Sequence, residues 1–343
     1  MRVCIVPEYP MSLMTGGLQV QAVETCRALS SMDGNMSAEL FDWSKTETPP
    51  DLYHFIGFPS HLHRIAELVH QAGRPYLITV LLGGPRSSLR LRMAAARRLA
   101  GSMLSGEKDR DKAISRAASI VTITETDATA AHVIFGVEKR KIAVVANGVA
   151  GGFFKCTPEA WHKTYGTSDF VLCVGAVQQR KNQLLLAQVC NRLKLALLLL
   201  GPVLPGERGY AQRVGEAMRE NEPLGGRWLE HLRNEDALLL SAYAACRVFA
   251  LISSAETQPL SVMQAMAARK PILLLKAPYA EDKLFRRLPQ ASSCELEAVA
   301  DALKQVWDGG AATELSPDYT WHGVARRLQT IYGAVLNSKE GMI

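Results

Sequence analysis

Short apolar runs alternate with helix-like segments along the whole chain, and this pattern limits the fold more than any other feature. VCIV at residues 3–6, YLITVLL at 76–82 and LALLLL at 195–200 are continuous apolar runs that lack a polar residue at every second position. Continuous apolar strands separated by helices are typical of parallel sheets that are covered on both faces. The sequence therefore predicts an α/β fold.

The strand–helix pattern restarts near the middle of the chain. The segment NGVAGGFFKCTPEAWHKTYGTSD at residues 147–169 is rich in Gly, Pro, Thr and Ser, which is typical of a domain seam. A length of 343 residues also fits two domains. We predict two Rossmann-like domains, 1–152 and 153–319, that face each other across a ligand-binding cleft.

Composition excludes several classes of protein. Hydrophobic residues make up 48% and charged residues 21%, as in an ordinary soluble globular protein. The longest apolar run, 195–204, is shorter than the roughly 20 residues that a membrane span needs, and the N-terminus resembles no secretory signal. Seven scattered cysteines without a CxxC motif favour a reduced, cytoplasmic protein without disulfides. His61 and His63 form an HxH with no acid or cysteine spaced to complete a metal site, so we expect no metal.

The net charge of +6 is concentrated in one stretch. Nine Arg or Lys side chains stand against three acids between residues 85 and 116. They form either a solvated helical face or a surface for anionic lipid headgroups or a phosphate-bearing acceptor. Nucleic acid is disfavoured because no aromatic residues interleave with the charges. The stretch thus predicts a peripheral contact with the inner face of a membrane as one of its two roles.

Three strand-to-helix junctions carry groups suited to a phosphate or a sugar. Gly16 and Gly17 open the first helix, where glycines let backbone amides approach a phosphate, although they also serve packing alone. In VGAVQQRKNQ, Arg180 and Lys181 precede Asn182, the expected N-cap of a helix. Two cations beside the positive end of a helix repel each other unless an anion is near, and a diphosphate would fill that role. Solvated loop side chains are the alternative.

The third junction is SSAETQPLSVMQ at 253–264. Pro259 suits the first turn of a helix, and Glu256 just before it can accept hydrogen bonds from sugar hydroxyls or simply complement the helix dipole. Gln264 lies one to two turns into the same helix.

With these motifs the second half of the chain resembles the nucleotide-binding domain of the retaining glycosyltransferases of family four, within glycosyl transferases group 1, which have the GT-B fold. That family carries two acids eight positions apart, and residues 256–264 here are ETQPLSVMQ. Four further segments fit its pattern in order: VGAVQQRKNQ, VVANGV, AYAACRVFALISSAE and the C-terminal YTWHGVARRLQTIY. TGGLQVQAVETCRAL near the N-terminus is similar to its glycine-rich turn and first helix, so the likeness covers nearly the whole chain.

The resemblance implies the chemistry. Lys181 and Arg180 would bind the leaving diphosphate of an NDP-sugar (UDP- or GDP-sugar), and Glu256 would hold hydroxyls of the transferred sugar. The implied donor-contacting residues are Gly16, Gly17, Gly175, Leu232, Thr257, Gln258, Pro259, Leu260 and Gln264. The final helix, 320–343, would cross back to the first domain. No cofactor or metal is implied, and the acceptor would be a glycan, a glycolipid or a small molecule.

Several positions depart from the family pattern. Ala176 replaces a phosphate-binding arginine, Gln264 replaces the second acid, and Arg269 replaces a glycine. Leu81 or Leu82 falls where many members have a histidine, and Pro259 removes one backbone donor. Two alternatives to the transferase stay open: a sugar-nucleotide epimerase, which has a similar two-domain architecture, and a non-catalytic sugar-nucleotide-binding protein, which Ala176 and Gln264 suggest.

Overall fold

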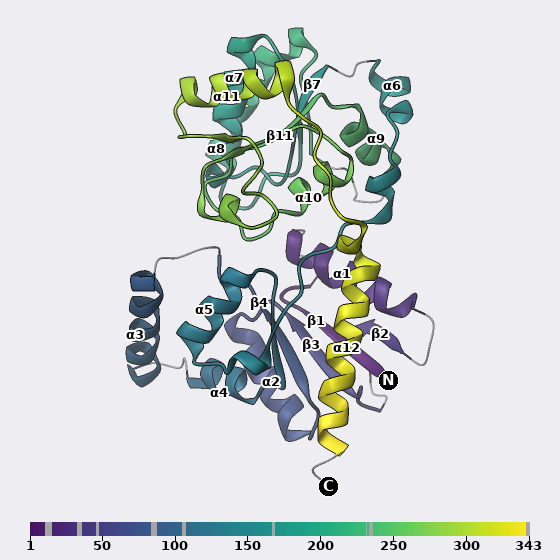
Figure 1. The fold of residues 1–343 in the computed structure, drawn as a ribbon, viewed down its shortest axis with the longest axis vertical. Coiled ribbons are helices and arrows are strands. Elements are labelled where there is room, and N and C mark those ends of the chain that lie inside the picture. The colour runs from purple at the N-terminus through teal and green to yellow at the C-terminus, as the bar shows by residue number, and fades with distance from the viewer. Residues whose placement is uncertain are drawn as a thin grey trace. The chain divides into compact units, whose positions relative to one another are not determined.

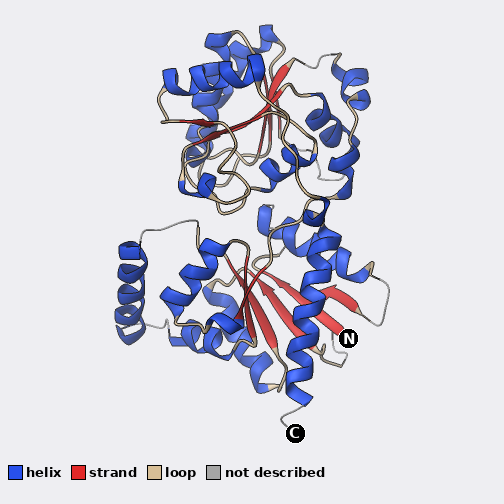
Figure 2. Ribbon diagram, in the orientation of Figure 1, coloured by secondary structure: helices blue, strands red, loops and turns tan. Residues whose placement is uncertain are grey.

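The structure, a computed structural model, describes residues 1–340 except 11–15, 33–35, 46–47, 84–87, 105–107, 167–168, 231 and 233–235. The chain forms two compact units (Figure 1): residues 1–148 with 318–343, and residues 149–317. Each unit is a parallel sheet flanked by helices (Figure 2), so the predicted α/β fold is confirmed.

The described part of the first unit contains one six-stranded sheet in the order β2-β1-β3-β4-β5-β6. Its strands are β1 (Arg2–Pro7), β2 (Ser37–Leu40), β3 (Leu52–Ile56), β4 (Tyr76–Val80), β5 (Ser119–Thr122) and β6 (Ile142–Val144). Its helices are α1 (Gly17–Ser30), α2 (Ser60–Gln71), α3 (Ser88–Leu104), α4 (Lys108–Arg116), α5 (Glu125–Phe135) and α12 (Trp321–Glu340). All neighbouring strands run parallel.

The described part of the second unit repeats this plan in the order β12-β11-β10-β7-β8-β9, again with parallel neighbours. Its strands are β7 (Phe170–Val174), β8 (Ala196–Leu200), β9 (Arg227–Leu229), β10 (Val248–Leu251), β11 (Ile272–Leu275) and β12 (Gln290–Ala291). Its helices are α6 (Glu159–Tyr165), α7 (Gln183–Leu193), α8 (Arg208–Asn221), α9 (Ala237–Ala245), α10 (Leu260–Ala267) and α11 (Leu296–Gly309). Short 3₁₀ turns link several of these elements, including Gln179–Lys181 between β7 and α7.

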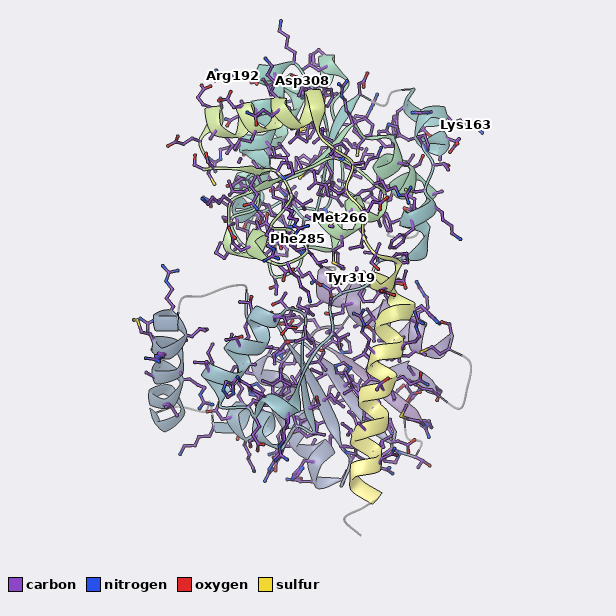
Figure 3. All side chains as sticks on the ribbon, viewed as in Figure 1. Lys163, Arg192, Met266, Phe285, Asp308 and Tyr319 are labelled. Atoms are coloured by element: carbon purple, nitrogen blue, oxygen red, sulfur yellow. The ribbon has the colours of Figure 1, made fainter. Side chains whose placement is uncertain are left out.

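Both cores are made of the continuous apolar strands. In the second unit β8 is buried along its whole length, and Met266 and Phe285 are buried, whereas Lys163, Arg192 and Asp308 are exposed (Figure 3). Strands that are buried on both faces require helices on both sides, which explains the alternation in the sequence.

Helix α12 is fixed to the first unit through Tyr332 and Trp321. The Tyr332 hydroxyl lies 2.7 Å from Nδ1 of His54 in β3, and Nε2 of His54 lies 2.7 Å from Oγ1 of Thr79 in β4. At the start of the helix Trp321 lies so close to Gly148 that a Cβ there would come within 2.7 Å of its ring.

His54 makes the first unit sensitive to acid. Burial lowers the pKa of His54 to about 3, so the folded protein keeps this ring neutral at pH values where the unfolded chain, with a pKa near 6.5, binds a proton. The contribution is present above pH 6.5 and is lost as the pH falls from about 6.5 towards 3. Between pH 7.5 and 5.5 we expect a loss of about 1.4 kcal/mol of unfolding free energy from this residue. The unfolding free energy is measured by urea unfolding at each pH, followed by a hydrogen-exchange pulse at one fixed pH. Exchange is read in peptides from β3 and α12.

His54→Gln is the matched variant, because an amide can still bond Thr79 and Tyr332 but does not titrate. Its loss of stability over the same pH interval is expected to be smaller by about 1.4 kcal/mol. Equal pH dependence in the two proteins would show that another group titrates instead.

Candidate functional site

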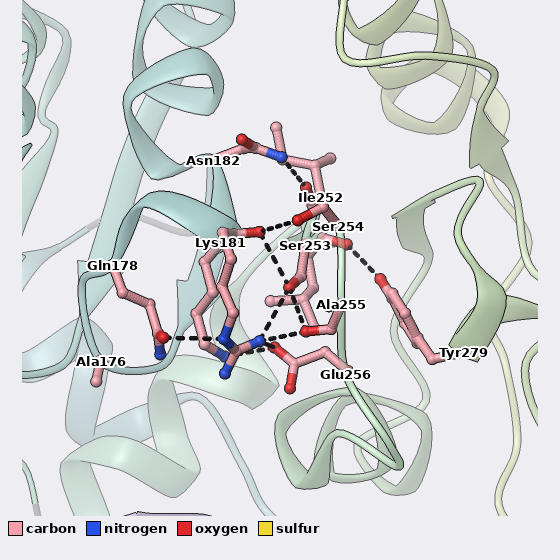
Figure 4. Close-up of polar contacts among 12 residues, drawn as sticks. Ala176, Gln178, Lys181, Asn182, Ile252, Ser253, Ser254, Ala255, Glu256 and Tyr279 are labelled. Carbon is pink, nitrogen blue, oxygen red and sulfur yellow. Dashed lines mark hydrogen bonds and ion pairs between the residues drawn. The ribbon is translucent and has the colours of Figure 1, made fainter. Parts of the chain in front are cut away.

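The candidate site lies at the carboxyl ends of β7 and β10, which are neighbours in the second sheet. In parallel sheets ligands bind beyond these strand ends, in the loops that lead into helices. The loop 175–182 follows β7 and the loop 252–259 follows β10, and polar contacts join the two (Figure 4). The polar residues of two motifs far apart in the sequence are therefore brought together.

Glu256 is the centre of this cluster. Its Oε1 lies 2.8 Å from Nη1 of Arg180 and 2.9 Å from Nζ of Lys181 (Figure 4). The side chains of Glu256 and Lys181 are only 12% and 10% exposed, while that of Arg180 is 39% exposed. One carboxylate thus pairs with two cations, one of them almost buried, and the three side chains together remain positively charged.

The charges around Glu256 decide its protonation. Burial by itself raises the pKa of the carboxyl, but the positive charges of Lys181 and Arg180 and their hydrogen bonds outweigh burial and hold the pKa below its ordinary value. Glu256 is therefore ionised at neutral pH and can act only as a hydrogen-bond acceptor.

Arg180 ties the two loops together. Its Nε donates to Oε1 of Gln178 at 2.9 Å, and its Nη1 donates to Oγ of Ser253 at 3.3 Å and to the carbonyl of Ala255. Its own carbonyl accepts from the backbone N–H of Ser254 at 2.8 Å. The guanidinium is held by several partners, so it occupies a defined position at the strand ends.

Asn182 corrects one expectation. It occupies the position before α7, but its side chain makes no capping hydrogen bond, and its backbone is left-handed with φ 54°. Its Nδ2 instead donates to the carbonyl of Ile252 at 2.9 Å. The residue therefore joins the two loops because asparagine tolerates this backbone conformation and has a side chain that can reach β10.

Gly175 makes room for Lys181. Its φ is +146°, and a Cβ at this position would lie 2.9 Å from Nζ of Lys181. Gly201, directly after β8, is required for a different reason: a Cβ there would lie 2.3 Å from the carbonyl oxygen of Gly175. The missing Cβ at Gly175 thus leaves space for the ammonium group of Lys181.

Helix α10 begins beside the cluster. Pro259 is the residue before the helix, one position earlier than expected, and its carbonyl accepts from Val262 and Met263. Thr257 and Leu260 are half-buried, and Gln258 is buried. Gln264 is also buried, and its Oε1 accepts a hydrogen bond from the Tyr243 hydroxyl of α9 at 2.9 Å.

Other predicted residues lie outside this cluster. Leu232 is half-buried beyond the end of β9, which stops at Leu229. Gly16 and Gly17 are exposed at the start of α1 in the first unit. The roles of all three in donor binding remain predictions.

Two departures from the family pattern have visible consequences. Arg269 has φ 56°, a conformation that costs a non-glycine residue roughly 1–2 kcal/mol, which gives a physical reason for the glycine usual at this place. Ala176 contributes no charge; its carbonyl accepts from Nε2 of Gln183 at 3.0 Å. Lys181 and Arg180 are therefore the cations that the described residues bring to Glu256.

No group of three or more His, Cys, Asp or Glu side chains within the described ranges could hold a metal ion. In the HxH pair, Nε2 of His61 lies 2.7 Å from the carbonyl of Glu8, and His63 is buried. Across the same residues, no helix has both the length and the apolar character of a membrane span.

The sequence did not reveal the residues that hold the site side chains in place. Ser253, Gln178 and Tyr243 each contact a predicted site residue. Only the serine had a signal, because it stands directly after a buried strand.

Comparisons with known proteins bear on the family and the fold of the chain. Residues 168–308 match the family model of glycosyl transferases group 1, which confirms the resemblance for that part of the chain. The assignment to family four stays a prediction. No curated protein sequence matches the chain.

Solved structures show the fold. Anabaena HepE, determined with UDP and glucose, is similar with a TM-score of 0.66 at 14% identity, covering 97% of this chain and 100% of that one. Sucrose-phosphate synthase from Thermosynechococcus elongatus gives 0.70 at 14% identity, covering 98% and 99%. WaaG, a glycosyltransferase involved in lipopolysaccharide biosynthesis, gives 0.58 at 12% identity, covering 95% and 94%. The predicted GT-B fold is thus confirmed.

Proposed function

We propose that this chain is a retaining glycosyltransferase that moves a sugar, most simply a hexose, from an NDP-sugar to an acceptor hydroxyl in the assembly of a cell-surface glycan or glycolipid. The observation that carries the proposal is the convergence of Glu256, Lys181 and Arg180 at the carboxyl ends of β7 and β10. The family match over residues 168–308 and the UDP bound to HepE support a nucleotide-sugar donor.

Lys181 and Arg180 are suited to a diphosphate. A nearly buried ammonium group and a guanidinium held by several partners offer preorganised positive charge in a site of restricted water. When the diphosphate binds these cations, Glu256 is released to accept hydrogen bonds from hydroxyls of the sugar. Backbone amides of Thr257, Gln258 and Leu260 lie next to Glu256 in sequence and are candidates for further contacts.

The chemical step requires stabilisation of a leaving group. The bond between the anomeric carbon and the phosphate oxygen breaks, and its electron pair stays on the diphosphate. Lys181 and Arg180 stabilise the charge that develops there. The acceptor oxygen bonds to the same face of the anomeric carbon, and its proton passes to the departing phosphate oxygen, so the products are a glycoside and a nucleoside diphosphate.

A panel of UDP-, GDP- and TDP-sugars tests the proposal in two assays. The first is the thermal shift caused by each nucleotide, and the second is release of nucleoside diphosphate with and without acceptors. We expect a shift with at least one nucleotide and slow donor hydrolysis that an acceptor accelerates. Nucleotide conversion without any acceptor favours an epimerase, and a thermal shift without turnover favours a binding protein. The absence of both signals rejects a donor site.

We also propose that α3 contacts a membrane of anionic lipids. Four of the basic side chains predicted to act there are engaged within the unit: Arg98 and Arg110 lie near Asp111, and Lys112 and Arg116 lie near Glu67. Arg86 is outside the described residues. Of the four that remain, Lys108 is exposed at the start of α4, and Arg90, Arg92 and Arg97 lie on α3.

The outward face of α3 combines charge with apolar groups. Leu91 and Ala94 pack towards Ile134 of α5. Away from that contact Met93 and Leu99 are 47% and 53% exposed, and Arg92 next to Met93 and Arg97 four residues after it are exposed as well. Apolar groups flanked by arginines fit the interface between headgroups and acyl chains.

Arg92→Glu together with Arg97→Glu is expected to weaken binding to vesicles of phosphatidylcholine with 30% phosphatidylglycerol by roughly tenfold or more, at about 1 kcal/mol per basic residue. Vesicle flotation measures it. Arg192→Glu with Arg219→Glu, on α7 and α8, gives the same charge change elsewhere and is expected to bind as the wild type does. Undiminished binding of the α3 variant would exclude this surface.

A further inference from the structure

The loop between β11 and β12 (residues 276–289, the basic loop) lies at the edge of the second sheet that carries the candidate site. β11 is the neighbour of β10 and runs parallel to it, so the basic loop and the loop 252–259 leave the sheet at the same edge. The Tyr279 hydroxyl donates to the carbonyl of Leu251, the last residue of β10, at 3.2 Å (Figure 4). The basic loop is therefore attached to the strand that leads to Glu256.

The basic loop is a closed and packed segment. The N–H of Leu274 donates to the carbonyl of Pro289, and the N–H of Lys276 donates to the carbonyl of Ala291, both at 2.9 Å, so the two ends lie side by side. Its inward side chains are buried, and they are those of Tyr279, Ala280, Phe285 and Leu288. The outward side chains are thus carried on a backbone that is fixed from both ends and from below.

The outer surface of the basic loop is positively charged. Its cations are all exposed, and they are Lys276, Lys283, Arg286 and Arg287. Across the part of the chain that the structure describes, none of these four side chains makes a hydrogen bond or an ion pair. Glu281 and Asp282 are the acids of the loop, so four cations against two acids leave an excess of two positive charges. Unpaired cations on one short loop repel each other until an anion binds.

The cations of the candidate site cannot balance a second anion. Lys181 and Arg180 against Glu256 leave one positive charge, which a diphosphate more than compensates. A further anion at the same sheet edge would be repelled by the diphosphate unless other cations were present. The basic loop supplies such cations at that edge.

The chemistry of the exposed positions points to phosphate groups. They are Lys, Arg, Glu or Pro, without a large apolar or aromatic side chain. Contact with a lipid surface uses exposed apolar groups, as α3 has, and binding of single-stranded nucleic acid uses exposed aromatic rings. A polar anion needs neither.

We propose that the basic loop binds phosphate groups of the acceptor, so that the acceptor is a phosphate-bearing sugar or glycan. The inference rests on the proposed function and narrows its acceptor. Phosphate on the acceptor pairs with the loop, and this offsets the repulsion between the acceptor and the diphosphate of the donor.

Calorimetric titration with sodium tripolyphosphate tests anion binding by the loop. It is carried out in a Lys181→Met, Arg180→Met background, which removes the cations of the donor site. We expect a dissociation constant of about 1 mM or tighter at low salt, as four exposed ion pairs can provide. Lys283→Glu with Arg286→Glu in this background is expected to weaken binding roughly tenfold or more, and Lys283→Gln with Arg286→Gln to weaken it less.

Arg192→Glu with Arg219→Glu is the matched control in the same background, because it makes the same charge change at exposed positions of α7 and α8. It is expected to leave tripolyphosphate binding unaltered. Absence of binding, or binding that the substitutions in the basic loop do not change, overturns the inference.

Two further measurements identify the ligand of the basic loop, with Lys283→Glu and Arg286→Glu in the otherwise wild-type chain. Flotation with the vesicles used for α3 is expected to be unchanged, and a loss of vesicle binding assigns the loop to a membrane and overturns the inference. With the acceptor that the donor panel reveals, KM for the acceptor is expected to rise roughly tenfold and KM for the donor to stay within about twofold. A rise in the donor KM alone overturns the inference and leaves the proposed function standing. Absence of transfer to any acceptor rejects the proposed function and the acceptor together, whereas the calorimetry decides anion binding in either case.

Discussion

Replacing Lys181 with methionine is expected to lower kcat/KM for the nucleotide-sugar donor by roughly 10²–10³-fold, the usual cost of removing one group that stabilises a developing negative charge. Lys181 is the cation best placed for this role, because its side chain is 10% exposed and lies over Gly175 with little water around it. Methionine fills a similar volume, so the loss reports charge and not packing. Initial rates of nucleoside diphosphate release over a range of donor concentrations measure it.

Arg180→Met is expected to have a smaller effect, about tenfold, since its side chain is 39% exposed and solvent screens its charge. Arg192→Met is the control: Arg192 pairs with Glu297 on the surface of the same unit, and both side chains are more than half exposed. It is expected to retain full activity. A Lys181→Met protein that is folded and as active as the control would show that the ammonium group takes no part in the reaction.

The sheets could be predicted because their strands carry their own signal. Ala196–Leu200 is buried along its whole length, so its sequence is apolar at every position. The edge strands β2 and β12 carry no continuous apolar run. Ser37–Leu40 is partly exposed along its length, and Gln290–Ala291 is a two-residue strand that pairs with β11. Strands at an edge are determined by their neighbour more than by their own composition.

The charged residues of the site could be predicted for a topological reason. Lys181 and Glu256 each follow a buried strand, and parallel strands bring such positions to one edge of a sheet. The hydrogen-bond partners of these charged residues could not be predicted, because they are set by contacts between segments that are distant in the sequence. Arg180 meets the carbonyl of Ala255 from 75 positions away, and Tyr243 reaches Gln264 across two helices.

Glu256→Gln is expected to have opposite effects on binding and on turnover. In the free protein the carboxylate pairs with the same two cations that a diphosphate would bind, so the ligand must displace it. The amide competes less, and affinity for the bare nucleoside diphosphate should rise about 3–10-fold, or roughly 1 kcal/mol. Turnover should fall by about 10²–10³-fold, because a neutral amide stabilises positive charge at the sugar poorly and makes weaker bonds to its hydroxyls.

Titration calorimetry with the nucleoside diphosphate and initial-rate kinetics with the intact donor separate the two effects. Glu297→Gln makes the same substitution in the exposed pair with Arg192 and should change neither quantity. Weaker nucleotide binding by Glu256→Gln would mean that the carboxylate supports the ligand instead of competing with it, for example by holding Lys181 in position. The sign of the affinity change therefore distinguishes a carboxylate that the diphosphate displaces from one that stays in place during binding.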